Sequence, residues 1–125
     1  MKYAINARKA PEAVGPYSQG TTAGRLVFTS GVIPVTDDCE VLIEGGIVEQ
    51  TERVIDIVEA VLSEVDCTLD DVAQTTLYLT DLSDLAAVNE VYADRFPMPA
   101  PSRSVVGVSA LPLGALIEMD CIACR

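Results

Sequence analysis

The chemistry open to this sequence is limited first by a residue type that it lacks. None of the 125 residues is a histidine. Without an imidazole the chain cannot form a Ser/His/Asp or Cys/His nucleophile, or the usual histidine metal site. Any catalysis must therefore use carboxylates, arginine, tyrosine, cysteine or backbone groups.

Arg103 is the residue best placed to bind an anion. It follows Pro101 and Ser102 at the start of a predicted strand, with no other basic residue between Arg95 and Arg125. A guanidinium fixed at a rigid strand end can bind a carboxylate through two parallel hydrogen bonds. From the residues alone, an ordinary surface arginine remains the alternative.

Two carboxylates, Glu118 and Asp120, alternate with apolar residues near the C-terminus. The alternation over residues 116–123 places both acids on one face of a strand, roughly 7 Å apart. Apolar neighbours favour partial desolvation of at least one carboxylate, which raises its pKa and prepares it to accept a proton. An exposed strand face is the alternative.

Two further motifs give weaker indications. Cys121-x-x-Cys124 has no second pair and no histidine to complete a metal site, and residues three apart in a strand point to opposite faces. We expect all four cysteines to be reduced, and no metal. The loop over residues 15–20 lacks phosphate-loop spacing, but it presents the hydroxyl of Tyr17.

Composition indicates one domain over residues 1–125. Half of the residues are apolar, which is enough for a chain of this size to bury roughly two-thirds of its unfolded surface. Nineteen acidic and eight basic residues give a net charge of -11, which repels nucleic acids and anionic membranes. The sequence has neither a secretory leader nor a stretch of 18 apolar residues, so we expect a cytoplasmic protein.

The elements that must position these residues alternate between strand and helix. Their composition and periodicity predict strands over 26–33, 72–80, 103–108 and 116–123, and helices over 47–65 and 84–96. Asp37-Asp38 indicates a turn, and Ser83 is the predicted cap of the second helix. The charged stripe Glu49, Glu52, Asp56 and Glu59 is expected to face solvent.

This order predicts an α/β protein with a mixed sheet and both helices on one face. Two helices leave the second face of the sheet open. A large exposed apolar face is an association site, so the composition predicts a homo-oligomer.

Several blocks of the sequence resemble the Rid family of reactive intermediate deaminases, once called the YjgF family. The resemblance covers essentially the whole chain, with the blocks in the order of the family. They are residues 10–19, Thr29-Ser30-Gly31-Val32-Ile33-Pro34, residues 81–89, Pro101-Ser102-Arg103-Ser104, and residues 117–123.

The resemblance implies a chorismate-mutase-like fold assembled as a barrel-like homotrimer, with ligand clefts between subunits. It implies hydrolysis of 2-imino acids, such as 2-iminobutanoate and 2-iminopropanoate, to 2-keto acids and ammonia. These substrates arise from enamines such as 2-aminoacrylate, and no metal or cofactor is required. The expected partners are small-molecule substrates and further copies of the chain, with no nucleic acid and no membrane.

The resemblance also assigns roles to residues. Arg103 matches the arginine that binds the substrate carboxylate, and Glu118 matches the carboxylate that orients or activates water. Four residues match positions that line or support the cleft: Tyr17, Ser30, Gly31 and Asn89.

Three positions depart from the family pattern. Val32 replaces a glutamine of many deaminases, Val105 replaces a cysteine of several, and Ser102 replaces an alanine. Val105 shares a strand face with Arg103, so we expect it to border the ligand as an apolar wall.

Two other functions remain open. One is a non-catalytic trimer that binds or senses a small carboxylate, such as a 2-keto acid. The other is the translation-inhibiting or ribonuclease role of some relatives, which the net charge of -11 and the lack of histidine disfavour.

Overall fold

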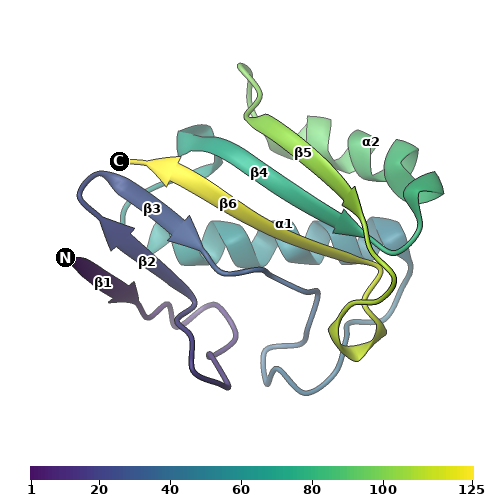
Figure 1. The fold of residues 1–125 in the computed structure, drawn as a ribbon, viewed down its shortest axis with the longest axis horizontal. Coiled ribbons are helices and arrows are strands. Elements are labelled where there is room, and N and C mark those ends of the chain that lie inside the picture. Colours follow the sequence, from purple (N-terminus) through teal and green to yellow (C-terminus); the bar gives the residue numbers. More distant parts are fainter.

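A computed structural model describes residues 1–125, and all strands lie in one six-stranded mixed sheet of order β1-β2-β3-β6-β4-β5 (Figure 1). The strands are β1 (Lys2–Ile5), β2 (Gly20–Ala23), β3 (Leu26–Thr29), β4 (Val72–Leu79), β5 (Ser102–Gly107) and β6 (Ile117–Cys124). The helices are α1 (Ile47–Ser63) and α2 (Leu85–Arg95), with short 3-10 turns at Leu69–Asp71, Leu82–Asp84 and Pro112–Gly114. Only β4 and β5 pair in parallel.

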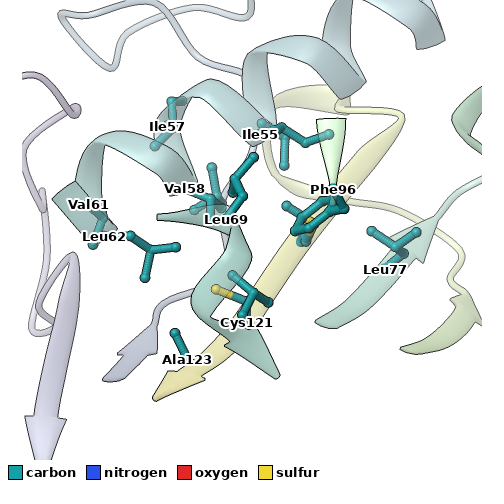
Figure 2. Packing of buried hydrophobic residues seen from close by; sticks show 14 of the residues in the cluster. Ile55, Ile57, Val58, Val61, Leu62, Leu69, Leu77, Phe96, Cys121 and Ala123 are labelled. Atoms are coloured by element: carbon teal, nitrogen blue, oxygen red, sulfur yellow. The ribbon is translucent and has the colours of Figure 1, made fainter. Parts of the chain in front are cut away.

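Alternation on β6 sorts its residues between the two faces of the sheet. Ile117, Met119, Cys121 and Ala123 are buried, whereas Glu118 and Asp120 are half-buried on the opposite face. The buried set packs under α1, and Figure 2 shows Val58 and Leu62 of α1 above Cys121 and Ala123. The predicted mixed sheet with two helices is therefore confirmed.

Both helices lie behind the sheet in Figure 1, so its near face carries no helix. We call this second surface the open face. Apolar side chains remain accessible there, including Val106, which is 40% exposed, and the half-buried Phe28 and Ile122. The structure also contains no helix long and apolar enough to cross a membrane.

The acidic stripe of α1 faces solvent, as expected: Glu49, Asp56 and Glu59 are exposed and Glu52 is half-buried. Part of the stripe also contacts α2. Arg95 at the end of α2 lies 2.6 Å from Glu52 and 2.8 Å from Asp56, with Glu59 at 3.8 Å. Three acids one turn apart converge on this guanidinium because i, i+3 and i+4 positions share one side of a helix. The stripe therefore joins α2 to α1.

Some element boundaries differ from the predictions. β3 ends at Thr29 instead of residue 33, because the chain leaves the strand and returns only at an isolated bridge between Val32 and Met119. The cap near α2 is Asp81, whose carboxylate accepts from the backbone N–H of Ser83 and begins a 3-10 turn. α2 itself therefore starts at Leu85. The turn at Asp37-Asp38 is confirmed.

Candidate active site

The strand register places the two principal site residues on opposite faces of the sheet. Arg103 is paired with Thr75, a fully buried residue on the helix-covered face. Glu118 is paired with Tyr78, which lies three residues further along the same strand. Side chains paired across neighbouring strands share a face, and residues three apart on a strand do not. One copy of the chain therefore cannot bring Arg103 and Glu118 together.

The first group of residues, which we call the arginine half, lies between α2 and β5. Arg103 and Asn89 line a hollow whose other walls are mostly apolar. The remaining lining residues are Tyr92, Ala93, Phe96, Met98, Ala100 and Pro101. A cation and a carboxamide beside an apolar wall can bind a small molecule that carries a carboxylate and a short aliphatic group.

The guanidinium of Arg103 is not neutralised within the chain. All four ion pairs in the structure use Arg53 or Arg95, and no side-chain hydrogen bond involves Arg103, although the chain has 19 acidic residues. Its nearest described interaction is with an aromatic ring, since its Cζ lies 4.9 Å from the centroid of Tyr92. The N–H donors of Arg103 therefore remain available to an external anion.

The second group, which we call the glutamate half, lies where β3 ends beside β6. Gly31 faces Glu118 so closely that a Cβ atom at position 31 would overlap Oε2 of the carboxylate. Ser30 is fixed next to it, because its Oγ donates to the carbonyl of Ser18 at 2.5 Å and its N–H donates to Gln19 at 3.0 Å. The Ser30 hydroxyl can then only accept a hydrogen bond from a ligand.

The pKa of Glu118 is raised above its ordinary value, first by burial and second by the negative charge of Asp120. Asp120 is itself held on the open face by the hydroxyl of Tyr78, which donates to its Oδ2 at 2.9 Å. Desolvation raises the proton affinity of a carboxylate, so Glu118 is a stronger base than a solvated glutamate. The predicted partial desolvation of this acid is confirmed.

Tyr17 lies on a loop that joins the same half-site. Its hydroxyl accepts from the backbone N–H of Val14 at 3.3 Å, and its side chain is 51% exposed. The loop is held by Gln19, whose carboxamide bonds the backbone of Ala7, Ala10 and Pro11. Tyr17, Ser30 and Gly31 line a cavity of about 70 Å³ whose remaining walls are mainly apolar.

The other residues singled out in the sequence lie near the two half-sites but contribute less to their walls. Val105 shares the face of Arg103, as expected, but it is half-buried against the core and does not line the hollow beside Arg103. Val32 is buried beside Met119 and lines the small cavity near Ser30. Burial raises the pKa of Cys121 to about 11 while Cys124 is exposed, so their opposite orientation is confirmed.

The four cysteines are free, as predicted. No group of three or more Cys, Asp or Glu side chains is arranged to hold a metal ion.

Four residues that support the site were not singled out in the sequence: Gln19, Thr75, Tyr78 and Tyr92. Tyr92 follows Asn89 by three residues on a predicted helix, and residues three apart share one side of a helix. Its position beside the arginine half could therefore have been predicted from Asn89. The positions of Thr75 and Tyr78 could not, because only the register of β4 against β5 and β6 brings them next to Arg103 and Glu118.

Comparison with known proteins identifies the family. The family model described as Endoribonuclease L-PSP matches residues 7–125. Reactive Intermediate Deaminase A, chloroplastic, from Arabidopsis thaliana is 42% identical over 98% of this chain and 65% of its own length. A 2-iminobutanoate/2-iminopropanoate deaminase from Mus musculus is 33% identical over 98% of this chain and 91% of its own.

The fold agrees with that assignment. A crystal structure of a Rid-family protein of unknown function from Yersinia pestis superposes with a TM-score of 0.94 and 39% sequence identity, covering 100% of both chains. The chain therefore belongs to the Rid family of reactive intermediate deaminases, the family whose model carries the name Endoribonuclease L-PSP.

Proposed function

We propose that this protein hydrolyses reactive 2-imino acids, such as 2-iminobutanoate and 2-iminopropanoate, to 2-keto acids and ammonia. The observation that carries the proposal is that the chain has both an un-neutralised Arg103 and a partly buried Glu118 with a raised pKa, each in its own half-site. The names of the Arabidopsis and mouse relatives support this reaction class. On this view residues 1–125 act as one Rid-type domain.

The half-sites must be brought together by a second copy of the chain. Because Arg103 and Glu118 lie on opposite faces of one sheet, the arginine half of one copy must face the glutamate half of another. The open face of the sheet offers the apolar surface for such an association. We propose a homotrimer with three such clefts, the assembly that the family resemblance implies. A repeated contact between unlike surfaces forms such a ring when its rotation closes after three copies.

In this cleft Arg103 and Asn89 bind the substrate carboxylate and orient its imine carbon. Glu118 of the neighbouring copy takes a proton from a water molecule as the water oxygen bonds to C2 and the imine π electrons move to nitrogen. Glu118 then returns this proton to the amine nitrogen of the tetrahedral carbinolamine, and the C–N bond breaks as the hydroxyl oxygen forms the C=O bond. The released ammonia takes up the hydroxyl proton and leaves as ammonium. Ser30 and Tyr17 offer oxygen atoms that orient the water or the imine N–H.

The overall reaction converts a protonated imine and water into a 2-keto acid and ammonium. No electrons are gained or lost, and a protonated imine is already electrophilic. We therefore propose that the reaction needs neither a metal nor a cofactor. A cytoplasmic location remains a prediction, and the name of the Arabidopsis relative places that protein in the chloroplast.

A binding protein without turnover is the second candidate. It is favoured by the arginine half, which offers a free cation, a carboxamide and an apolar wall within one chain and without Glu118. A ribonuclease remains the third hypothesis, because the family model carries that name. The net charge of -11 still opposes RNA binding.

The test couples a pyridoxal-phosphate-dependent threonine dehydratase to this protein and follows early 2-ketobutyrate release. Wild type is compared with Arg103→Ala and Glu118→Gln, and calorimetry measures 2-ketobutyrate binding to each. Arg8→Ala is the matched control, because Arg8 is the other arginine without an ion pair or side-chain hydrogen bond in the chain. We expect wild type and Arg8→Ala to accelerate release.

The two variants separate the candidates. A deaminase predicts that Arg103→Ala loses both binding and acceleration, while Glu118→Gln binds 2-ketobutyrate but loses most acceleration. A binding protein predicts that wild type binds 2-ketobutyrate without accelerating its release. Strong RNA binding that weakens steeply with salt would favour the ribonuclease hypothesis instead.

A further inference from the structure

Tyr92 is the residue in closest described contact with the Arg103 guanidinium. The Cζ atom of Arg103 lies 4.9 Å from the centroid of the Tyr92 ring. A cation at this distance over an aromatic face is attracted by the ring quadrupole. The arginine that the proposed function depends on is therefore supported by an aromatic side chain, in a protein where two other arginines are paired with acids.

The Tyr92 ring is fixed at more than one point. Its hydroxyl shares a 2.7 Å hydrogen bond with Oγ1 of Thr75, a residue with no exposed surface. Phe96, one helical turn further along α2, stacks on Tyr92 with ring centroids 4.3 Å apart and planes inclined by 26°. Tyr92 is only 6% exposed. Few alternative rotamers remain for a ring held at its hydroxyl and packed on its face.

Thr75 gives this arrangement a direct link to the sheet. It is the register partner of Arg103 on the adjacent strand, and both side chains lie on the helix-covered face. The backbone of Arg103 and the hydrogen-bond partner of its aromatic support are therefore held by neighbouring strands of the same sheet. The relative position of ring and guanidinium is set by strand pairing and by the docking of α2.

An aromatic support differs chemically from an ion pair. A carboxylate partner would occupy N–H donors of the guanidinium and cancel its charge. A ring beneath the guanidinium leaves the donors at its edge free and keeps the charge. It also limits the rotamer freedom that a long exposed side chain would lose on binding an anion.

We propose that Tyr92, held by Thr75, is a positioning residue that fixes Arg103 for binding a ligand carboxylate. The role rests on the proposed function of Arg103 as the carboxylate-binding residue. Neither Tyr92 nor Thr75 needs to touch the reacting atoms. Loss of either should weaken ligand binding and leave the chemical step of bound substrate much less affected.

The first measurement is independent of ligand and activity. In ¹⁵N-labelled protein, the Nε–Hε group of Arg103 is assigned by its loss in Arg103→Ala, and its heteronuclear NOE reports its order. We expect an ordered, ring-shifted resonance in wild type. Tyr92→Leu should return it to the position and mobility of a free arginine, and Tyr92→Phe, which keeps the ring, should retain most of the ring shift.

The second measurement is binding of 2-ketobutyrate by calorimetry, with kcat and KM from the coupled assay. We expect the dissociation constant to rise about tenfold in Tyr92→Leu and about two- to threefold in Tyr92→Phe and Thr75→Val, on the scale of a partly buried cation–π contact. KM should change more than kcat. The double variant Tyr92→Phe/Thr75→Val should be no worse than either single variant, since both remove the same hydrogen bond.

Val91→Ala is the control for loss of core packing, because Val91 is a buried neighbour on α2 outside the hollow beside Arg103. If Tyr92→Leu or Thr75→Val binds 2-ketobutyrate as well as wild type does, or if Val91→Ala weakens binding as strongly, the positioning role is wrong. If wild type neither binds 2-ketobutyrate nor accelerates its release, the proposed function fails. The Nε–Hε resonance then decides separately whether Tyr92 fixes Arg103.

Discussion

The arginine half and the glutamate half prepare charged groups in opposite ways. Arg103 is kept fully available by an aromatic neighbour, and no acid of its own chain neutralises it. Glu118 is made more basic by burial and by a nearby like charge. One half thus preserves a charge for binding, and the other destabilises a charge to favour proton uptake. On the proposed function, turnover should need both halves and binding only the arginine half.

The largest effect is expected when two inactive variants, one defective in each half, are combined in the same oligomer. Arg103→Ala and Glu118→Gln should each lack activity, but unfolding and refolding them together should restore it. If each site takes one residue from each of two copies, about a quarter of the sites in an equal mixture would carry both native residues.

The control for this experiment is the same equal mixture prepared without refolding, which keeps the copies unexchanged. Absence of recovery in mixed oligomers, verified by mass spectrometry to contain both variants, would mean that the two halves do not share a site. Recovery in the mixture that was not refolded would point to an impurity or to exchange of copies without unfolding.

A smaller effect is expected from Gly31→Ala, which acts on the glutamate half alone. The added Cβ would occupy the space of the Glu118 carboxylate and displace it. We expect kcat to fall about a hundredfold, the scale of a catalytic group misplaced by an ångström. Calorimetry should show that 2-ketobutyrate binding changes far less.

Gly46→Ala is the matched comparison, because Gly46 has nothing within 4 Å of the added carbon and, like Gly31, has no positive φ. It controls for the effect of replacing a glycine by alanine without a steric clash. Equal loss of activity in both variants would show that the loss does not come from displacement of the Glu118 carboxylate.

Asp120→Asn should shift the pH dependence of the glutamate half. Glu118 must be ionised to accept a proton, so activity rises with pH through its pKa. Burial is the larger cause of its raised pKa, and Asp120 is the second. Removing that charge lowers the Glu118 pKa, so the acidic limb of kcat against pH should move to lower pH.

Asp70→Asn provides the charge-matched control, because Asp70 is an exposed residue on a short turn and does not contribute to the Glu118 shift. Its profile should coincide with that of wild type. An unchanged limb in Asp120→Asn would show that burial alone sets the proton affinity of Glu118.

Arg95→Met should have the smallest effect. It weakens the contact of α2, the helix that lines the arginine half, with α1. It removes the contacts that join α2 to Glu52 and Asp56 of α1. These acids are about half exposed, so we expect the free energy of unfolding to fall by about 1 kcal/mol or less in urea titrations. A loss well above that value would mean that the helix pair depends on this network.

Much of the fold was predictable because its elements have clear periodicity. The α1 stripe and the alternation on β6 each match a single structure, and burial follows both patterns. β1 and β2 were not located from the sequence, since four-residue strands carry too little periodicity. The end of β3 was predicted too late because Val32 and Ile33 remain apolar after the strand has ended.

The candidate site was less accessible to sequence reasoning. Arg103 and Glu118 could be chosen by residue type, by their strand context and by resemblance to the Rid family. Their placement on opposite faces depends on the register of β4 with both neighbours, which no local pattern encodes. The contact between the acidic stripe of α1 and Arg95 was not predicted for a related reason, because Arg95 lies 39 residues away from Asp56.

The close approach of Gly31 to Glu118 also has a consequence for how such proteins diverge. A side chain at position 31 would force the Glu118 carboxylate away from the place that it occupies here. The two positions are therefore expected to vary together among related chains. A relative with a larger residue at position 31 should hold its side chain at position 118 in another orientation or carry a different residue there.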